Sequence, residues 1–464
     1  MEQSKLIEQL FAEIKHLKER VAHLESVDKE NERLRKENIV LHQKLSKYEH
    51  PKNSNNSSIP PSKDENRPLK TKSLRKKGGK AGGQKGHEGN TLKMTDNPDK
   101  VIDYVSDFCG KCGCDLQDIP QEFIGKRQVV DIPVIQPEYI EHRIYRRTCN
   151  CGHSTCTSYP QNVNASISYG ANTESLVGYL FSRQYMPFER MREFFNDAFH
   201  LPISEGGIHQ LLNRLTNKAT PAYNIIKEKI ESSKVVGADE TGAKINGKKS
   251  WVWTWQNDKL TYITPSENRG FATIESNFKN GFKNAVLLHD CWKSHFKTPA
   301  LNHQICTAHL LRELNYFIEV HKDSWVIKFR QLLLDSLEVN RIMKHNDYFT
   351  THQPKVAIQS RFEELLKQNI DKKRPDLVTF YNRITKYKDY LFNFLKYPDL
   401  PPDNNGSERA IRNIKVKQKI SGQFKSFAGA MNFSMLRSIT DTAIKNNQNV
   451  LAALFTIAEL EVTD

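Results

Sequence analysis

The chain has 464 residues and a formal net charge of +15 at pH 7, with 27% charged and 38% hydrophobic residues. A chain of this length exceeds what one hydrophobic core supports, so we expect several domains. The positive charge favours a polyanionic partner, with nucleic acid ahead of an anionic membrane surface. No apolar run approaches the roughly 18 residues that span a bilayer, and no signal-peptide centre is found; we therefore expect a cytoplasmic protein without membrane association.

Residues 1–48 are predicted to form one long helix and, through it, a coiled coil. Apolar residues recur at spacings of three and four, slip once by one residue and then resume. The seam consists of Ile7, Leu10, Ile14, Leu17, Val21, Leu24, Val27, Asn31, Leu34, Asn38, Leu41 and Leu45. Its two asparagines would fix register and strand number at some cost in stability. The alternative is a single amphipathic helix that packs on its own domain.

Residues 49–95 are predicted to be a flexible basic linker, because they contain too little apolar surface to form a core. Basic residues gather in its second half, and we expect Lys76 and Lys77 to contact DNA phosphates. The alternative is a solvated linker whose charge only aids solubility.

A zinc-binding domain is predicted for residues 96–162. Cysteines are expected to stay reduced in the cytoplasm, and two closely spaced pairs beside glycine turns are typical of a structural zinc site. The expected Zn²⁺ ligands are Cys109, Cys112, Cys149 and Cys151. Three further side chains compete as ligands: Cys114, His153 and Cys156.

The pattern turns helical over residues 163–232. A first helix is expected before Pro187, a second over Phe188–Phe199 and a third over Ile208–Leu215, with Ser204 as N-cap of the third. Two helices joined by a short turn fit a helix-turn-helix reader of DNA. A plain helical packing layer is the alternative.

From residue 233 the pattern predicts a sheet. The expected elements are a strand at Val235–Asp239, strands at Ser250–Gln256 and Leu260–Thr264, a helix at Phe271–Phe278, and strands at Ala285–Asp290 and His303–Cys306. Asn246-Gly247 is typical of a hairpin turn. This order is that of a ribonuclease H-like core, with residues 233–310 as its first part, an all-helical insertion at 311–399 and a second part at 400–464. The fold class is therefore multidomain α/β.

Three acids are the candidate catalytic residues and ligands of Mg²⁺: Asp239, Asp290 and Glu408. The first two are expected at the tips of neighbouring buried strands, and the third on a packed helix. Carboxylates so placed can hold two hard cations, Mg²⁺ or Mn²⁺, which clamp the attacking and leaving oxygens of a phosphodiester. Glu240 is a rival to Asp239, although it should point the opposite way along the strand, while Thr241 shares the face of Asp239.

Basic residues follow the third acid. The expected DNA contacts are Arg409, Arg412, Lys415 and Lys417. The alternative for Arg412 is an ordinary helical ion pair with Glu408, four residues earlier. A second small cluster, Cys306 and His309, could bind metal, but core packing or a hydrogen bond near the active site is the more common role for such a pair.

Taken together, these features resemble the transposases of the insertion-sequence-66 family, a bacterial DDE group, over nearly the whole chain. The motifs that carry the resemblance are Asn56–Ser62, Gly82–His87, the cysteine pairs, Asp239–Thr241, Cys306–His309 and Asn404–Arg412. The sequence departs from the family at Cys149 and Cys151, which have one residue between them where two are usual, so the fourth zinc ligand stays open.

The resemblance implies a DNA transposase that cuts at the ends of its element and joins the freed 3′-hydroxyl groups to target DNA, associated with the bacterial nucleoid. It maps the DDE triad onto Asp239, Asp290 and Glu408. Bringing two ends together requires at least a dimer, and small accessory proteins of the same element are implied as partners. Two rivals stay open: a non-catalytic DNA-binding repressor, and a nuclease that hydrolyses without joining.

Overall fold

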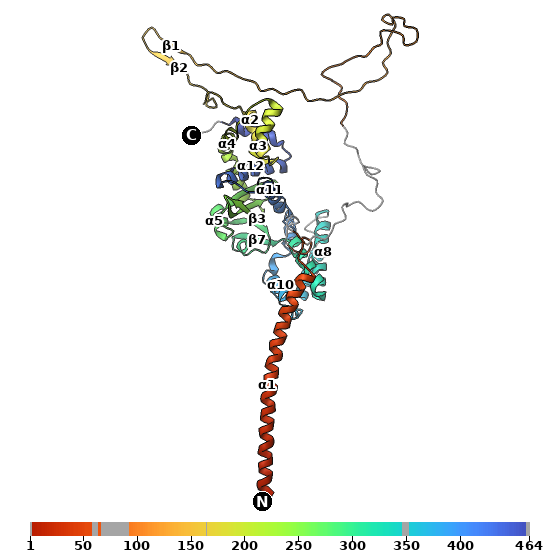
Figure 1. Cartoon of the computed structure of the whole chain (residues 1–464), viewed down its shortest axis with the longest axis vertical. Coiled ribbons are helices and arrows are strands. Elements are labelled where there is room, and N and C mark those ends of the chain that lie inside the picture. The colour runs from red at the N-terminus through yellow and green to blue at the C-terminus, as the bar shows by residue number, and fades with distance from the viewer. Residues whose placement is uncertain (1, 58–63, 66–91, 164, 346–351, 461–464) are drawn as a thin grey trace.

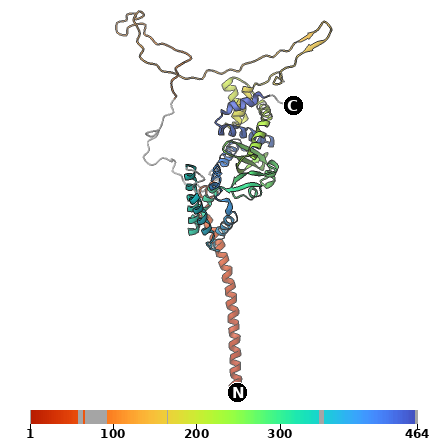
Figure 2. The same ribbon diagram turned by 180° about the vertical axis from the view of Figure 1, so that it is seen from behind.

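The computed structural model describes residues 2–57, 64–65, 92–163, 165–345 and 352–460. A compact body contains the sheet and most of the helices, and helix α1 (Glu2–Glu49) projects from it as a rod (Figures 1 and 2). Within the described residues, no helix combines the length and the apolar character that a bilayer crossing needs.

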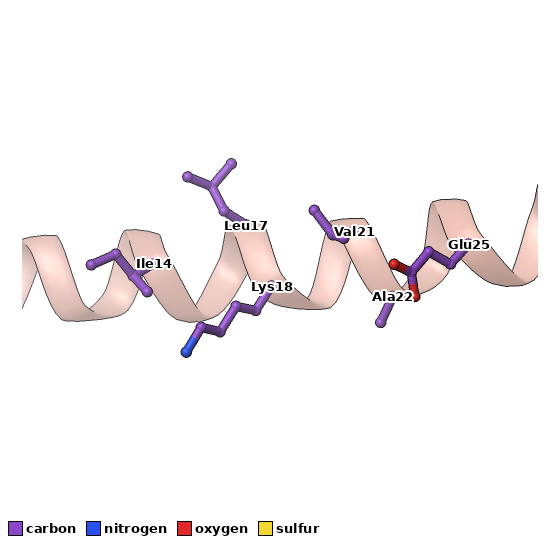
Figure 3. Close-up of a pocket in the computed structure, with 6 residues that line it drawn as sticks. All are labelled: Ile14, Leu17, Lys18, Val21, Ala22 and Glu25. Atoms are coloured by element: carbon purple, nitrogen blue, oxygen red, sulfur yellow. The ribbon is translucent and has the colours of Figure 1, made fainter.

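The long N-terminal helix is confirmed, and the apolar side chains of its seam are exposed to solvent. Leu17 and Val21 are 51% and 53% exposed, and they point to one side of the helix while Lys18 points to the other (Figure 3). This exposure argues against the alternative of a helix packed on its own domain. The coiled coil itself stays a prediction.

Residues 92–163 run as an extended segment above the body (Figure 1). Its regular structure is a short hairpin of β1 (Arg146–Thr148) and β2 (Ser154–Cys156). Most of its side chains are exposed, including Val129 at 95% and Tyr104 at 92%. The segment therefore has no hydrophobic core of its own in this structure.

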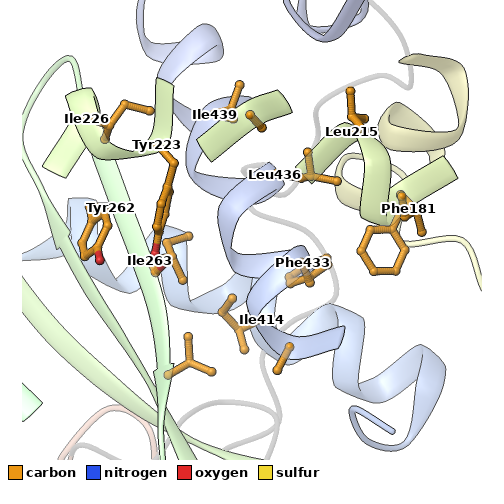
Figure 4. Packing of buried hydrophobic residues seen from close by; sticks show 14 of the residues in the cluster. Phe181, Leu215, Tyr223, Ile226, Tyr262, Ile263, Ile414, Phe433, Leu436 and Ile439 are labelled. Carbon is orange, nitrogen blue, oxygen red and sulfur yellow. Dashed lines mark hydrogen bonds between the residues drawn. The ribbon is translucent and has the colours of Figure 1, made fainter. Parts of the chain in front are cut away.

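A helical layer follows, as predicted, formed by α2 (Ala171–Ser182), α3 (Phe188–Phe199) and α4 (Glu205–Glu231). Ser204 caps α4, because its hydroxyl accepts the N–H of Gly207 at 3.0 Å. α4 is longer than predicted and packs on the sheet and on α12, with Leu215, Tyr223 and Ile226 in the shared core (Figure 4). The packing-layer interpretation therefore holds; reading of DNA by α4 stays a prediction.

The sheet has five strands in the order β5-β4-β3-β6-β7. Their bounds are Val235–Ile245 for β3, Lys248–Gln256 for β4, Thr261–Ser266 for β5, Phe282–His289 for β6 and Ala300–Ile305 for β7. β3 is antiparallel to β4 and parallel to β6, and β6 is parallel to β7. The predicted hairpin turn is confirmed, since Asn246 and Gly247 both have positive φ (47° and 75°).

The ends of all five strands differ somewhat from the prediction, and the largest difference concerns β3. Asp239 does not end β3, because the strand continues to Ile245 in its pairing with β4. Thr241, Ala243 and Ile245 are buried on this extension, and that burial sustains the strand beyond the acid. The parallel pairing with β6, in contrast, is recorded only from Val235 to Gly237.

Two hydrophobic clusters cover the sheet. Along β6, Ala285 and Leu287 belong to the first cluster, while Val286 and Leu288 belong to the second, as the period of two requires. The first cluster also contains residues of α12 (Phe427–Lys445) and α13 (Val450–Glu459). Phe433, Leu436 and Ile439 of α12 face the helical layer and β5 (Figure 4).

The second cluster is the predicted helical insertion together with the strand ends that it covers. Its helices are α7 (Thr307–His321), α8 (Ser324–His345), α9 (His352–Leu366), α10 (Pro375–Lys386), η1 (Lys388–Tyr390) and η2 (Asn393–Leu395). The short helices α5 (Phe271–Asn277) and α6 (Lys293–Phe296) connect strands within the sheet domain. The chain returns from the insertion as α11 (Asn405–Ser421), which packs on β3 and β4.

Candidate active site

Asp239 and Asp290 are placed by the parallel pair β3 and β6. The register pairs Val235 with Val286 and Gly237 with Leu288. Extending this register by two residues brings Asp239 level with Asp290, which directly follows β6. The predicted neighbourhood of the two acids therefore arises from the sheet itself, although only Asp290 lies at a strand tip.

The first turn of α11, which carries Glu408, is placed beside β3 by a close contact. Gly237 has no room for a side chain: a Cβ there would lie 2.6 Å from Asn404 Oδ1 and 3.0 Å from Ser407 Oγ. Buried Asn404 donates from Nδ2 to the carbonyl of Ala238 at 2.8 Å, and Ser407 Oγ and Asn404 Oδ1 are 2.7 Å apart. The first turn of α11 is thus fixed on the backbone beside Asp239. The sequence showed the motif at 404–412, but not that Asn404 and Gly237 form its docking contact.

Glu408 has a cationic partner that the sequence analysis missed. Arg312 on α7 donates from Nη2 to Glu408 Oε1 at 2.9 Å, and His309 Nε2 lies 3.8 Å from the same oxygen. Arg412, in contrast, lies 3.9 Å from Glu408 Oε2 and is 71% exposed. The helical ion pair considered for Arg412 is therefore secondary to the contact from the insertion.

The charge at this site suits a hard divalent cation. The pKa of Asp239 is raised well above its usual range, first by burial and then by repulsion from Asp290, Glu240 and Glu408. Carboxylate oxygens that repel one another in this way are the donors that Mg²⁺ prefers. Among the described residues, however, no three His, Cys, Asp or Glu side chains lie close enough to form a metal site. The carboxylate oxygens are suitable ligands for Mg²⁺. Glu408, however, is paired with Arg312 in this structure and does not complete a metal site.

Glu240 has a structural environment different from that of Asp239. It is buried and accepts hydrogen bonds from Arg269 Nε at 2.8 Å and from His295 Nε2 at 3.1 Å. Burial alone would raise its pKa, but His295 and Arg269 outweigh this effect and the pKa is lowered. His295 Nε2 also lies 4.0 Å from Asp290 Oδ1. Glu240 therefore holds Arg269 and His295, the second of which lies beside Asp290, and it is no rival to Asp239.

The basic residues expected on DNA divide into two groups. Arg409 and Arg412 are exposed on α11, as a phosphate contact requires. Lys415 and Lys417 turn inward, which corrects the prediction for them: Lys415 Nζ donates to the carbonyl of Gly242, and Lys417 is 5% exposed and lies over the ring of Phe181. Every third or fourth residue of a packed helix faces the core, whatever its charge.

Lys76 and Lys77, the other predicted DNA contacts, lie outside the described residues, as does the motif Gly82–His87.

The cysteine pairs form two separate halves of the expected zinc site. Backbone N–H groups of Cys112 and Lys111 donate toward the Cys109 sulfur and lower its pKa, and Cys151 does the same for Cys149. Such turns suit thiolate ligands of zinc. Cys149 and Cys151 lie between β1 and β2, and among the described residues no three such side chains come close enough to hold a metal ion, so the structure does not bring the four sulfurs together.

Cys306 has the non-metal role that was considered for it. It is fully buried, and its sulfur accepts the backbone N–H of Asn404 at 3.2 Å. Burial raises the pKa of this thiol to about 11, so it stays protonated at neutral pH. Cys306 thus helps to hold the segment that leads into α11.

A mixed five-stranded sheet with helices on both faces, with Asp239 on one strand and Asp290 directly after its parallel neighbour, defines an α/β protein with a candidate acid site. Comparison with known protein families identifies the family of the chain. Residues 167–432 match the transposase IS66 family, and residues 106–152 match the zinc-finger binding domain of transposase IS66. Because the first match covers more than half of the chain, the chain belongs to the IS66 family of transposases, and DNA is its partner. No curated protein matches it significantly.

Proposed function

We propose that this transposase cuts DNA at the ends of its element and joins the freed 3′ ends to target DNA, with Asp239, Asp290 and Glu408 as catalytic residues. The observation that supports the proposal is geometric: the register of β3 with β6 brings Asp239 level with Asp290, and Asn404 docks the first turn of α11, which carries Glu408, on the backbone beside Asp239. The sheet order, with three antiparallel strands followed by two parallel ones, supports a ribonuclease H-like core.

The residues of the chain then have distinct roles. Asp239, Asp290 and Glu408 would hold Mg²⁺, which would supply positive charge opposite the attacking and leaving oxygens of the phosphodiester. Arg409 and Arg412 bind phosphates of the strand, since both are exposed beside Glu408. His295 and Arg269, paired with Glu240, keep Asp290 and its loop in place.

Strand-transfer assays with DNA that carries the element's own ends test this proposal. Asp239→Asn, Asp290→Asn and Glu408→Gln should each lower cleavage and joining by roughly a thousandfold or more, because each removes a charged ligand. Asp258→Asn, an exposed carboxylate in the turn after β4, is the matched control. Full activity in a triad variant would overturn the assignment. Inactivity of the wild type with both Mg²⁺ and Mn²⁺ would favour a DNA-binding repressor, and cut but unjoined DNA would favour a nuclease.

We also infer that Cys109, Cys112, Cys149 and Cys151 bind one structural Zn²⁺ once the two halves meet. The family match at 106–152 includes all four, and the turns at both pairs supply backbone donors to sulfur. Metal analysis and X-ray absorption should show one zinc with four sulfur neighbours. Zinc that stays bound with unchanged neighbours in Cys149→Ser would contradict this ligand set.

A further inference from the structure

An exposed tryptophan lies directly beside the acid site. Trp292 follows Asp290 by two residues, and its backbone N–H donates to Asp290 Oδ1 at 2.8 Å. Its side chain is 37% exposed, whereas Trp253, Trp255 and Trp325 are buried in the two cores. Trp292 is therefore a large aromatic surface that the packing of the fold does not use fully.

The Trp292 ring is held firmly from one side. The guanidinium carbon of Arg269 lies 3.9 Å from its centroid and 4.7 Å from that of Trp251, so the arginine is layered between two indoles. Arg269 is in turn fixed by Glu240, which accepts its Nε–H at 2.8 Å. A ring held by such a stack loses little side-chain freedom when a further planar group stacks on it.

The surroundings of the ring are basic. Lys293 and Lys297 are exposed on and just after α6, and Lys249 lies over Trp251 at 5.4 Å. Aromatic rings interleaved with cations are what proteins use to bind single-stranded nucleic acid, since every base has a face that can stack and every link carries a negative charge. An apolar protein partner would not need these cations.

We propose that Trp292 is the stacking platform for one unstacked base of the DNA strand whose phosphate lies at Asp239 and Asp290. The proposal rests on the proposed function for its ligand and adds a binding site to it. The base would lie against the indole of Trp292, the lysines would contact neighbouring phosphates, and Arg269 with Glu240 would keep the indole in position.

Photocrosslinking tests the site directly. The probe is an oligothymidylate of about 12 nucleotides, within the usual site size, with 5-iodouracil substituted for some bases. It is bound to the full-length protein in buffer without added Mg²⁺ or Mn²⁺, so that catalysis plays no part and any structural zinc is retained, and crosslinked peptides are identified by mass spectrometry. We expect a crosslink at Trp292 in the wild type and in Asp239→Asn. The variants to compare are Trp292→Leu, Trp292→Phe and, as a control, Phe427→Leu, which alters an aromatic residue that is 42% exposed at the start of α12.

Affinity and its salt dependence give a second readout. Trp292→Leu should weaken binding of the unmodified oligonucleotide by about tenfold, Trp292→Phe by less, and Phe427→Leu not measurably. The slope of log affinity against log salt should not change in Trp292→Leu, because no phosphate contact is lost, whereas Lys293→Gln should lower the slope by about one. If Trp292 stacks on a base, Trp292→Leu should lower the affinity and leave the salt slope unchanged. If the substitution instead unfolded the protein, both the affinity and the salt slope would fall.

The proposal is overturned if Trp292 is not crosslinked, or if Trp292→Leu binds as tightly as the wild type. A crosslink at Trp292 in a protein whose triad variants remain active would refute the proposed catalytic residues and keep the base platform. Loss of activity in the triad variants without a crosslink at Trp292 would support the proposed catalytic residues and refute the base platform.

Discussion

Arg312 Nη2 lies 2.9 Å from Glu408 Oε1, so the acid that completes the candidate triad is paired with a side chain of the helical insertion. The two residues come from α7 and α11, and both are partly buried, with Arg312 at 26% and Glu408 at 19% exposure. A guanidinium at this position neutralises Glu408 and occupies one of the oxygens that a cation needs. Arg312 and the divalent cation are therefore expected to compete.

Replacing Arg312 should strengthen cation binding. In Arg312→Gln a positive charge is removed beside the acids, and Glu408 is free to turn toward Asp239, so we expect roughly tenfold tighter binding of Mg²⁺. Calorimetric titration of the full-length protein with Mg²⁺ measures this. Arg341→Gln, which breaks an exposed Arg–Glu pair on α8, is the control and should bind Mg²⁺ as the wild type does. Equal or weaker binding by Arg312→Gln would contradict the competition.

Gly237→Ala should damage the site more than an ordinary glycine substitution. The new Cβ would lie 2.6 Å from Asn404 Oδ1 and from Gln256 Nε2, so both side chains must shift, and the Asn404 contact that docks α11 on β3 is disturbed. We expect the free energy of unfolding to fall by about 2 kcal/mol and strand transfer to fall by more than tenfold. Gly242→Ala on the same strand is the matched control, because its nearest neighbour would be 3.8 Å away. Similar urea midpoints and similar activities for the two variants would refute the docking contact.

The sequence predicted the elements of this fold better than the contacts between them. Strand period, the Asn246-Gly247 turn and the Ser204 cap are local signals, and the structure contains all three features. The pairing of Glu408 with Arg312 joins residues 96 positions apart and has no local signal. A short buried glycine contact such as that of Gly237 leaves no pattern in a single sequence either.

Two charged residues show that the sequence also failed to predict which charged side chains are buried. Lys417 lies in a basic run that suggests DNA, yet its place on the helix turns it into the core. Glu240 is adjacent to Asp239 in sequence, but the alternation of the strand gives it other partners. Charge indicates a partner class, while burial depends on which face of the element packs.

The buried ammonium of Lys417 predicts a pH dependence of stability. Burial lowers its pKa from 10.5 to about 8, so between these values the unfolded chain binds more protons than the folded one. Stability of the wild type relative to Lys417→Met should therefore rise as the pH increases from about 8 to about 10.5, and should be constant below about pH 8. Urea unfolding across this range measures the difference, with exposed Lys419→Met as control. A difference that stays flat, or falls, would contradict the burial of a charged lysine.

The exposed seam of α1 predicts self-association. Leu17→Asp places a charge on the apolar side of the helix and should shift the protein toward monomer at micromolar concentration, because a buried charge at a seam position is costly. Lys18→Asp changes the charge on the other side and should leave the mass unchanged (Figure 3). Light scattering after size-exclusion chromatography gives the molar mass. The same mass for wild type and Leu17→Asp would rule out this seam as the interface.

The central claim is that acids from β3, β6 and α11 share divalent cations. A crystal structure of the full-length protein with Mn²⁺ and an oligonucleotide, using the anomalous signal of manganese, tests it most directly. We predict manganese bound by Asp239, Asp290 and Glu408, with Arg312 displaced from Glu408. Anomalous density absent from these acids, or manganese bound there while Glu408 still pairs with Arg312 beyond ligand reach, would contradict the account.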